Sequence, residues 1–256
     1  MNSSPESQFN QVARAYATSA VHALGPDLEW LVAELRPQAG WKVLDAGCGA
    51  GHAALAVTAY VEEVIAVDVA DKMLRVAADL AAERGVTNFS PVLTSVGNMP
   101  FPNRSFDAAI TRFSTHHWPD PRADITEIAR VLRTGAPFVL IDAVGFEDTA
   151  LDTFLNTLEL LRDPSHVRNA TVAQWSLHLE KAGFAVESVK RWDVRLDIAE
   201  WLARSATVEW RQTAVKHLLQ EAPAPARTAL SISGDCSSFS LPCAMIRAKL
   251  ERSTSE

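Results

Sequence analysis

The chain of 256 residues has little of three features, each of which would define a class of protein. Its three cysteines are few and irregularly spaced, which excludes a disulfide framework and favours a reducing compartment. No apolar run approaches the roughly 18 residues of a membrane-spanning helix, and the first residues lack the pattern of a secretion signal. Lys and Arg number 24 against 31 Asp and Glu, and the net charge of −7 disfavours broad contact with nucleic acid or anionic lipid. We therefore expect a cytoplasmic protein of enzyme size without membrane or nucleic-acid partners.

From Trp41 onward, short apolar segments alternate with helical patterns, which is typical of a mostly parallel sheet with helices on both faces. Pro91 falls inside the third predicted strand, where a proline is tolerated only at a sheet edge or a bulge. The predicted strands are Lys42–Asp45, Val64–Asp68, Phe89–Thr94, Phe106–Thr111 and Pro137–Ala143, and the helices between them are His52–Tyr60, Asp71–Arg84 and Pro121–Leu132.

Helical patterns lie on both sides of this core. Upstream, Gly25 and Pro26 divide a helix over about Phe9 to Leu24 from a second helix that ends before Pro37. Downstream, Thr171 and Gln174 form a capping box that begins a helix reaching Ala182. The remaining predicted segments are strand Phe184–Trp192, a helical insert Arg195–Gln220 ended by Pro223 and Pro225, and strand Ser238–Arg247, where Pro242 requires an edge or a bulge.

We expect a single domain over residues 1–256. Its parts are a cofactor-binding core at 41–192, an N-terminal helical cap at 1–37 and a helical lid insert at 195–236.

A glycine-rich turn, VLDAGCGAG over Val43–Gly51, follows the first strand. Gly47 and Gly49 allow the turn to tighten and let backbone approach a ligand. The carboxylate of Asp45 precedes the turn, and no Lys or Arg lies in it to offset repulsion of a pyrophosphate. His52 also occupies the third small position of the dinucleotide fingerprint. A phosphate-free ligand with a cationic end, such as S-adenosylmethionine, therefore suits the turn better than NAD.

Asp68 ends the second strand, 21 residues after Gly47 (68 − 47). In a strand–helix–strand unit, this spacing places the carboxylate where it can accept ribose hydroxyls. Met73, in the first turn of the next helix, could pack on a flat ring, although a lone methionine is more often part of a core.

These motifs resemble the class I S-adenosylmethionine-dependent methyltransferases, and within them the UbiE-like small-molecule group, methyltransferase type 11. VLDAGCGAG, VDVADKML, MPFPNRSFD and EIARVLRTGAPFVLID occur in family order, and the resemblance covers about Phe9 to Ala185. It implies a Rossmann-like α/β fold. The seven-stranded, mostly parallel sheet has helices on both faces and order 3-2-1-4-5-7-6, with the last strand antiparallel.

The resemblance also implies the cofactor, S-adenosyl-L-methionine, its product S-adenosyl-L-homocysteine, and the residues that bind it. An acidic residue often stands where this chain has Ser95, so that contact departs from the family pattern. For Tyr16, in an FxxxAxxY pattern, simple helix packing is the alternative. The implied cofactor-binding residues are Asp45, Gly47 and Gly49 for the methionine moiety, Asp68 for the ribose, Met73, Ser95 and Val96 for the adenine, and also Tyr16. Arg112, after the fourth strand, is a further candidate contact of the cofactor, and it could instead hold its own segment or pair with an acidic substrate group.

The candidate catalytic residues are His116 and His117, which follow the fourth strand. The carboxyl ends of such strands face the ligand crevice, and a histidine pKa of about 6.5 suits a base at neutral pH. A catalytic base, a substrate or cofactor contact and structural packing are open readings for the two residues. We expect no metal, since the Cys and His residues lack zinc-site spacing.

We therefore expect a transferase that moves a methyl group to an oxygen, nitrogen or carbon of a small, possibly aromatic or heterocyclic metabolite, as a monomer or homodimer. The alternatives are a cyclisation or decarboxylation on the same fold, and non-catalytic S-adenosylmethionine binding. Two further features are open. Trp192, Trp201 and Trp210 could cap a flat substrate or only bury the insert, and the loop with Arg162, His166 and Arg168 could bind an anion or be solvated.

Overall fold

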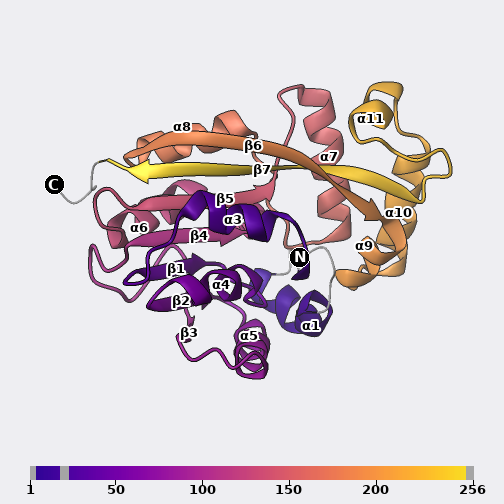
Figure 1. The fold of residues 1–256 in the computed structure, drawn as a ribbon. Coiled ribbons are helices and arrows are strands. Elements are labelled where there is room, and N and C mark those ends of the chain that lie inside the picture. The colour runs from indigo at the N-terminus through magenta and orange to yellow at the C-terminus, as the bar shows by residue number, and fades with distance from the viewer. Residues whose placement is uncertain (1–3, 18–22, 252–256) are drawn as a thin grey trace.

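The computed structural model describes residues 4–17 and 23–251, and it describes no side chains for residues 15–17. One seven-stranded sheet of order β3-β2-β1-β4-β5-β7-β6 crosses the molecule (Figure 1). β1 to β5 pair in parallel, and β7 runs antiparallel to both of its neighbours. The predicted fold class and strand order are confirmed. The strands are β1 Lys42–Ala46, β2 Glu63–Asp68, β3 Phe89–Leu93, β4 Ala108–Arg112, β5 Pro137–Ala143, β6 Phe184–Asp197 and β7 Ser238–Leu250.

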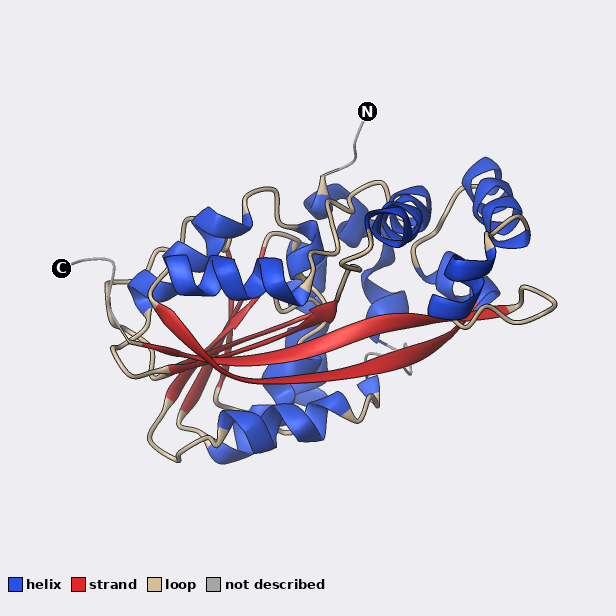
Figure 2. Ribbon diagram, turned by 90° about the horizontal axis from the view of Figure 1, so that it is seen from above, coloured by secondary structure: helices blue, strands red, loops and turns tan. Residues whose placement is uncertain are grey.

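Helices cover both faces of the sheet (Figure 2). Because successive residues of a strand point to opposite faces, neighbours in β1 enter different cores. Val43 packs in one core with Leu31 and Leu35, while Leu44 packs in the other with Ile128 and Trp175. The described helices are α1 Pro5–Ala17, α3 Asp27–Leu35, α4 His52–Val57, α5 Asp71–Glu83, α6 Pro121–Val131, α7 Thr149–Arg162, α8 Val172–Lys181, α9 Ile198–Arg204, α10 Glu209–Gln220 and α11 Ala224–Ala229, with 3-10 turns η1 Thr58–Tyr60 and η2 Thr115–His117.

The two strand prolines have different explanations. Pro91 lies in β3, an edge strand, as expected. The bulge expected at Pro242 is wrong, since this residue pairs regularly with Asp193 and the bulge of β6 lies between Val186 and Ser188. The Pro242 carbonyl accepts the Val144 N–H, one residue beyond the end of β5. The Pro242 nitrogen faces the same side, where the ladder with β5 has ended, so the missing N–H costs no ladder hydrogen bond.

The last two strands are longer than predicted and carry the helices between them, α9 to α11, beyond the end of the other strands (Figures 1 and 2). Residues 195–197, expected to be helical, continue β6, and the insert becomes helical only at Ile198. The far half of this hairpin has its own core, where Leu196 and Phe239 pack with side chains of α7, α9 and α10. As expected, the insert breaks before Pro223, since α10 ends at Gln220. Pro223 is the N-cap of α11 and Pro225 lies in its first turn, a position that proline suits.

Other local predictions vary in accuracy. The Thr171–Gln174 capping box is present, and Asp120 caps α6 through the Ala123 N–H. The sequence reading missed α7, and β4 begins at Ala108 rather than Phe106, which makes only an isolated bridge. Within the described ranges, no helix combines the length and apolar composition needed to cross a bilayer.

Candidate functional site

A cavity of about 960 Å³ lies at the carboxyl ends of β1, β2 and β4, where ligands bind in open parallel sheets. Residues that the sequence assigned to a cofactor make up much of its wall: Gly47, Gly49, Asp68, Met73, Ser95, Val96 and Arg112.

The glycine turn is fixed to the end of β2. The Gly47 and Cys48 N–H groups both donate to the Val67 carbonyl at 2.9 Å. Gly49 has a φ of 52°, in the left-handed region that favours glycine, and its N–H donates to Asp68 Oδ2 at 2.8 Å. A Cβ at Gly49 would have no atom within 4 Å, so the turn borders open space there.

Asp68 presents a buried carboxylate to the cavity. Its Oδ1 accepts the Ala70 N–H at 2.9 Å, and its Oδ2 accepts the Gly49 N–H. Burial raises the pKa of Asp68, and these two N–H groups oppose the rise. Each carboxylate oxygen can accept a second hydrogen bond, so both can still bind ligand hydroxyls.

Asp45 lies deeper than the sequence suggested and is not among the residues lining the cavity. Its Oδ2 accepts the Ala54 N–H at 3.0 Å, while Oδ1 is buried without a hydrogen-bond partner among the described residues. Burial, assisted by the Asp68 charge, raises the pKa of Asp45 to about 7. A cation near the turn would reverse much of this rise.

Three further positions complete the first cavity. Met73 packs with Ala13 of α1 in a small apolar cluster, so it belongs to both a core and the cavity wall. The sequence reading missed Asp124 of α6, which lines the cavity together with Ser95 and whose pKa is raised to about 6 by burial and by Asp120. Tyr16 lies on α1, and its side chain is outside the described residues.

Arg112 lines the first cavity and also makes a two-pronged ion pair with Asp27 of α3. The Nε–Oδ2 distance is 2.5 Å and the Nη2–Oδ1 distance is 3.1 Å. Both side chains are 4% exposed, so the pair ties α3 to the end of β4 inside the protein.

A second cavity of about 530 Å³ adjoins the first, and the two share Phe9, Phe113 and His117 as lining residues. Strand ends of the long hairpin, together with α7 and α9, supply its other walls. The apolar lining is Ala143, Val194, Leu196, Trp201, Leu241 and Cys243, and the polar lining is His116, Glu159, Arg162, Asn169 and Arg204.

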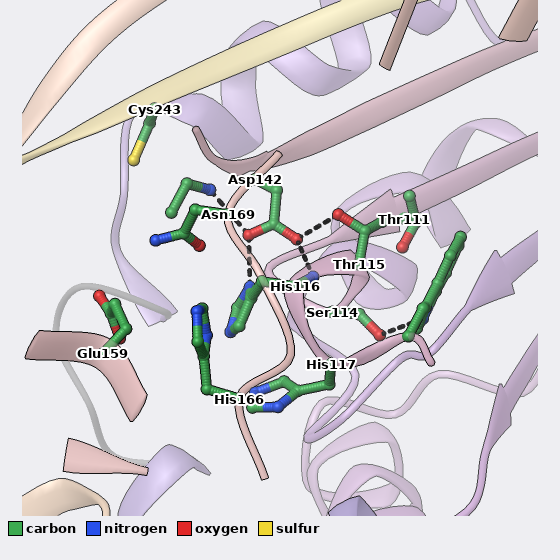
Figure 3. A network of polar contacts seen from close by, with 12 residues as sticks. Thr111, Ser114, Thr115, His116, His117, Asp142, Glu159, His166, Asn169 and Cys243 are labelled. Atoms are coloured by element: carbon green, nitrogen blue, oxygen red, sulfur yellow. Dashed lines mark hydrogen bonds and ion pairs between the residues drawn. The ribbon is translucent and has the colours of Figure 1, made fainter. Parts of the chain in front are cut away.

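His116 and Asp142 form a buried pair at the edge of the second cavity (Figure 3). His116 Nδ1 lies 2.6 Å from Asp142 Oδ1, and Asp142 Oδ2 accepts the Thr115 hydroxyl at 2.6 Å. Burial lowers the pKa of His116, but the charge and hydrogen bond of Asp142, together with the Glu159 carboxylate, raise it, and the net pKa is above the ordinary value. With Nδ1 held by the carboxylate, Nε2 is the nitrogen that can accept a proton.

His117 has a different environment, although it adjoins His116. Its Nδ1 lies 3.1 Å from the Ser165 carbonyl oxygen, which fixes that nitrogen as the N–H, and its ring meets Phe9 edge-on at 4.8 Å between centroids. Burial and the neighbouring His116 lower the pKa of His117, and burial lowers that of His166 to about 2. At neutral pH these two rings are therefore neutral.

The sequence left two readings open for the loop after α7, an anion-binding site or a solvated loop. In the structure this loop is partly buried. Arg162 and His166 are buried, and Arg168 pairs with Asp152 at 2.5 Å. The three tryptophans have different environments. Trp201 is 1% exposed and lines the second cavity, Trp210 is 62% exposed, and Trp192 packs edge-on against Trp30. Among the described residues, no group of three or more His, Cys, Asp or Glu could hold a metal ion.

The sheet order, the glycine turn and the acidic end of β2 together define a Rossmann-like methyltransferase fold. A family model described as "Methyltransferase domain" matches residues 44–140. The chain is also 35% identical over 246 residues to the uncharacterized methyltransferase YcgJ of Bacillus subtilis, covering 94% of this chain and 97% of the relative. The chain belongs to the methyltransferase family.

Solved structures agree with this assignment. The crystal structure of YcgJ matches with a TM-score of 0.85 at 33% identity, covering 88% of this chain and 98% of YcgJ. BH2331 of Bacillus halodurans also matches with a TM-score of 0.85, at 27% identity, over 89% of this chain and all of the other. The [4+2]-cyclase SpnF, with a TM-score of 0.59 and 22% identity over 87% of this chain and 78% of its own, shares the fold.

Proposed function

We propose that the protein transfers a methyl group from S-adenosylmethionine to an oxygen, nitrogen or carbon atom of a small molecule held in the second cavity. The observation that carries the proposal is that two cavities meet at Phe9, Phe113 and His117. The first has the glycine turn and Asp68, and the second has a histidine whose pKa is raised by a buried carboxylate.

The residues of the first cavity fit a nucleoside with a cationic end. Asp68 has acceptor capacity for ribose hydroxyls, Gly49 borders open space, and the buried Oδ1 of Asp45 has no partner among the described residues. Asp124, beside Ser95 in the lining, supplies the acidic group that the family often has at the Ser95 position. When bound, S-adenosylmethionine supplies a methyl group on a positively charged sulfur, a leaving group that needs no acid.

The protein therefore has to exclude water, align the acceptor and remove a proton where the acceptor carries one. His116 is the base in this proposal, because Asp142 fixes its tautomer and stabilises its protonated form. His117, whose pKa is lowered, is instead a neutral contact between the two cavities. Cyclisation or decarboxylation stays the alternative, and transfer of label from methyl-labelled S-adenosylmethionine into a metabolite extract distinguishes it.

The first test is binding of S-adenosylhomocysteine by calorimetry. Asp68→Ala should weaken binding by more than tenfold, since two hydroxyls lose a charged acceptor. Asp79→Ala, an exposed acid on α5, should leave the affinity unchanged. An affinity within about twofold of the wild type for Asp68→Ala would refute the cofactor placement.

The predictions of a cytoplasmic monomer or homodimer, with no metal and no nucleic-acid or membrane partner, stay predictions.

A further inference from the structure

Asn169 has a buried side-chain amide that makes no hydrogen bond among the described residues. It is 1% exposed and lines the second cavity beside Cys243 and His116 (Figure 3). Neither its amide oxygen nor its amide nitrogen has a hydrogen-bond partner among the described residues. Buried amides in proteins are normally hydrogen-bonded, and an exception is expected where a ligand completes the site.

The backbone around Asn169 is held firmly by hydrogen bonds, which fixes the position of its Cα beside the second cavity. The Asn169 N–H donates to Asn156 Oδ1 at 2.7 Å, and the Ala170 carbonyl accepts the Gly145 N–H at 3.1 Å. The N–H groups of Val167 and Arg168 donate to the His116 carbonyl at 2.9 and 3.1 Å. The loop that carries Asn169 is thus fixed to the backbone of the proposed base.

The charged groups of the cavity cancel while His116 is neutral. By count, two carboxylates, Glu159 and Asp142, match the guanidinium groups of Arg162 and Arg204, and Glu159 pairs directly with Arg162 at 3.4 Å. An acceptor that brought a full charge of its own would be left uncompensated, and burying such a charge is costly. A neutral acceptor is therefore favoured, with His116 Nε2 able to remove its proton.

The apolar walls of the second cavity limit the shape of the methyl acceptor. Trp201 is fixed by an edge-on contact with Phe239 at 4.9 Å between centroids and by the Arg162 guanidinium over its ring at 5.1 Å. With Phe113, Leu196 and other apolar side chains, it forms an apolar wall whose flat aromatic faces suit a small ring compound.

From these contacts we infer that the methyl acceptor is a small neutral ring compound with a phenolic or enolic hydroxyl facing His116 and a second oxygen function that hydrogen-bonds to Asn169. The O–H bond breaks, an N–H bond forms at His116 Nε2, and the electron pair stays on oxygen. Asn169 is then a specificity-determining residue, since its amide can donate to a carbonyl or hydroxyl oxygen and accept from a hydroxyl. This inference rests on the proposed function, because it takes the second cavity as the acceptor site.

The experiment compares two probes that differ by one hydroxyl, 2,3-dihydroxynaphthalene and 2-naphthol. Dissociation constants are measured by calorimetry with S-adenosylhomocysteine present. The wild type should bind the diol about tenfold more tightly, a factor typical of one well-made buried hydrogen bond. In Asn169→Leu, of similar size, and in Asn169→Ala, the ratio should fall to about one, while the affinity for S-adenosylhomocysteine stays within about twofold.

The matched control is Asn88→Leu, which removes an amide that donates to the Thr58 and Val61 carbonyls and is not part of the lining of either cavity, so the ratio should not change. The inference is overturned if the ratio is unchanged in both Asn169 variants, if the wild type does not discriminate, or if neither probe binds. These are binding measurements, so they do not depend on turnover. Loss of S-adenosylhomocysteine binding or absence of label transfer would count against the proposed function instead.

Discussion

Replacing Asp142 by asparagine is the sharpest test of the proposed base. The substitution keeps the size of the side chain but removes the negative charge 2.6 Å from His116 Nδ1. The carboxylates of Asp142 and Glu159 raise the pKa of His116, whereas burial and the charge of Arg162 lower it. The neighbouring rings of His117 and His166 would also oppose its protonation if they were charged. Of the two carboxylates, Asp142 raises the pKa of His116 more.

An opposite charge within about 4–6 Å changes a pKa by about 1–3 units, so the pKa of His116 should fall by that amount in Asp142→Asn. At about 1.4 kcal/mol per unit, the change corresponds to about 1.4–4 kcal/mol of lost stabilisation of the protonated ring. The wild-type rate should rise with pH as His116 loses its proton, through a midpoint above 6.5, and this midpoint should move to lower pH in the variant. The plateau rate should fall by about 10²–10⁴, because the tautomer is no longer fixed and the base is weaker.

The assay that needs no substrate is NMR titration of protein labelled at the histidine rings, with His116→Gln identifying the resonance. Asp142→Asn should lower that resonance's titration midpoint. Asp107→Asn, at a carboxylate that pairs with Arg133 and lies at the opposite end of β4 from His116, should not. A wild-type His116 that titrates at or below about 6.5, or a midpoint unchanged by Asp142→Asn, would show that the pair does not tune the base.

Three other substitutions test the frame of the site. Arg112→Met should cost about 3–5 kcal/mol in urea unfolding, because it leaves the buried Asp27 carboxylate unpaired; a loss below about 1 kcal/mol would contradict this. Gly51→Ala should lower the free energy of unfolding by about 2–4 kcal/mol in the same assay, since Gly51 has a φ of 82° and a Cβ there would lie 2.9 Å from the Ala77 Cβ. The control Gly40→Ala should be near neutral, because a Cβ at Gly40 would have no atom within 4 Å. The affinity for S-adenosylhomocysteine should increase by up to about tenfold per pH unit as the pH rises toward 7, because the ligand's ammonium favours ionised Asp45. Calorimetry of Asp45→Asn should show no such pH dependence. An identical pH profile in that variant would exclude Asp45 as the cause.

Much of the first cavity could be predicted because its signals are local. The glycines at 47 and 49, Asp68 at a strand end and Met73 in the following helical turn lie within one strand–helix–strand unit, whose geometry depends on short-range rules. Asp45 is the instructive exception. Its position beside the glycine turn was right, but only the packed structure placed its carboxylate behind the turn, where burial raises its pKa.

The same strand-end reasoning could have found Asp142, an acidic residue at the end of the buried run PFVLIDA, but it could not have paired it with His116. That pairing depends on the register of β4 beside β5. The length of β6 was missed because its alternating residues after Trp192 become buried only against α7, α9 and α10, which are distant in sequence.

The sequence alone indicated the class of fold, since periodicity and a short motif encode a strand–helix–strand unit locally, and its resemblance to the methyltransferases implied the family and the order of the strands. Only the tertiary structure distinguishes the two histidines, and the proposal of His116 as the base rests on it. His116 and His117 are adjacent in the chain and identical in type. They differ because Asp142 meets one ring, whereas burial and the neighbouring His116 lower the pKa of the other ring, whose Nδ1 meets the Ser165 carbonyl. The tertiary structure also decided that Asn169 faces the second cavity with its amide unsatisfied, because burial and hydrogen bonding depend on contacts across the whole chain.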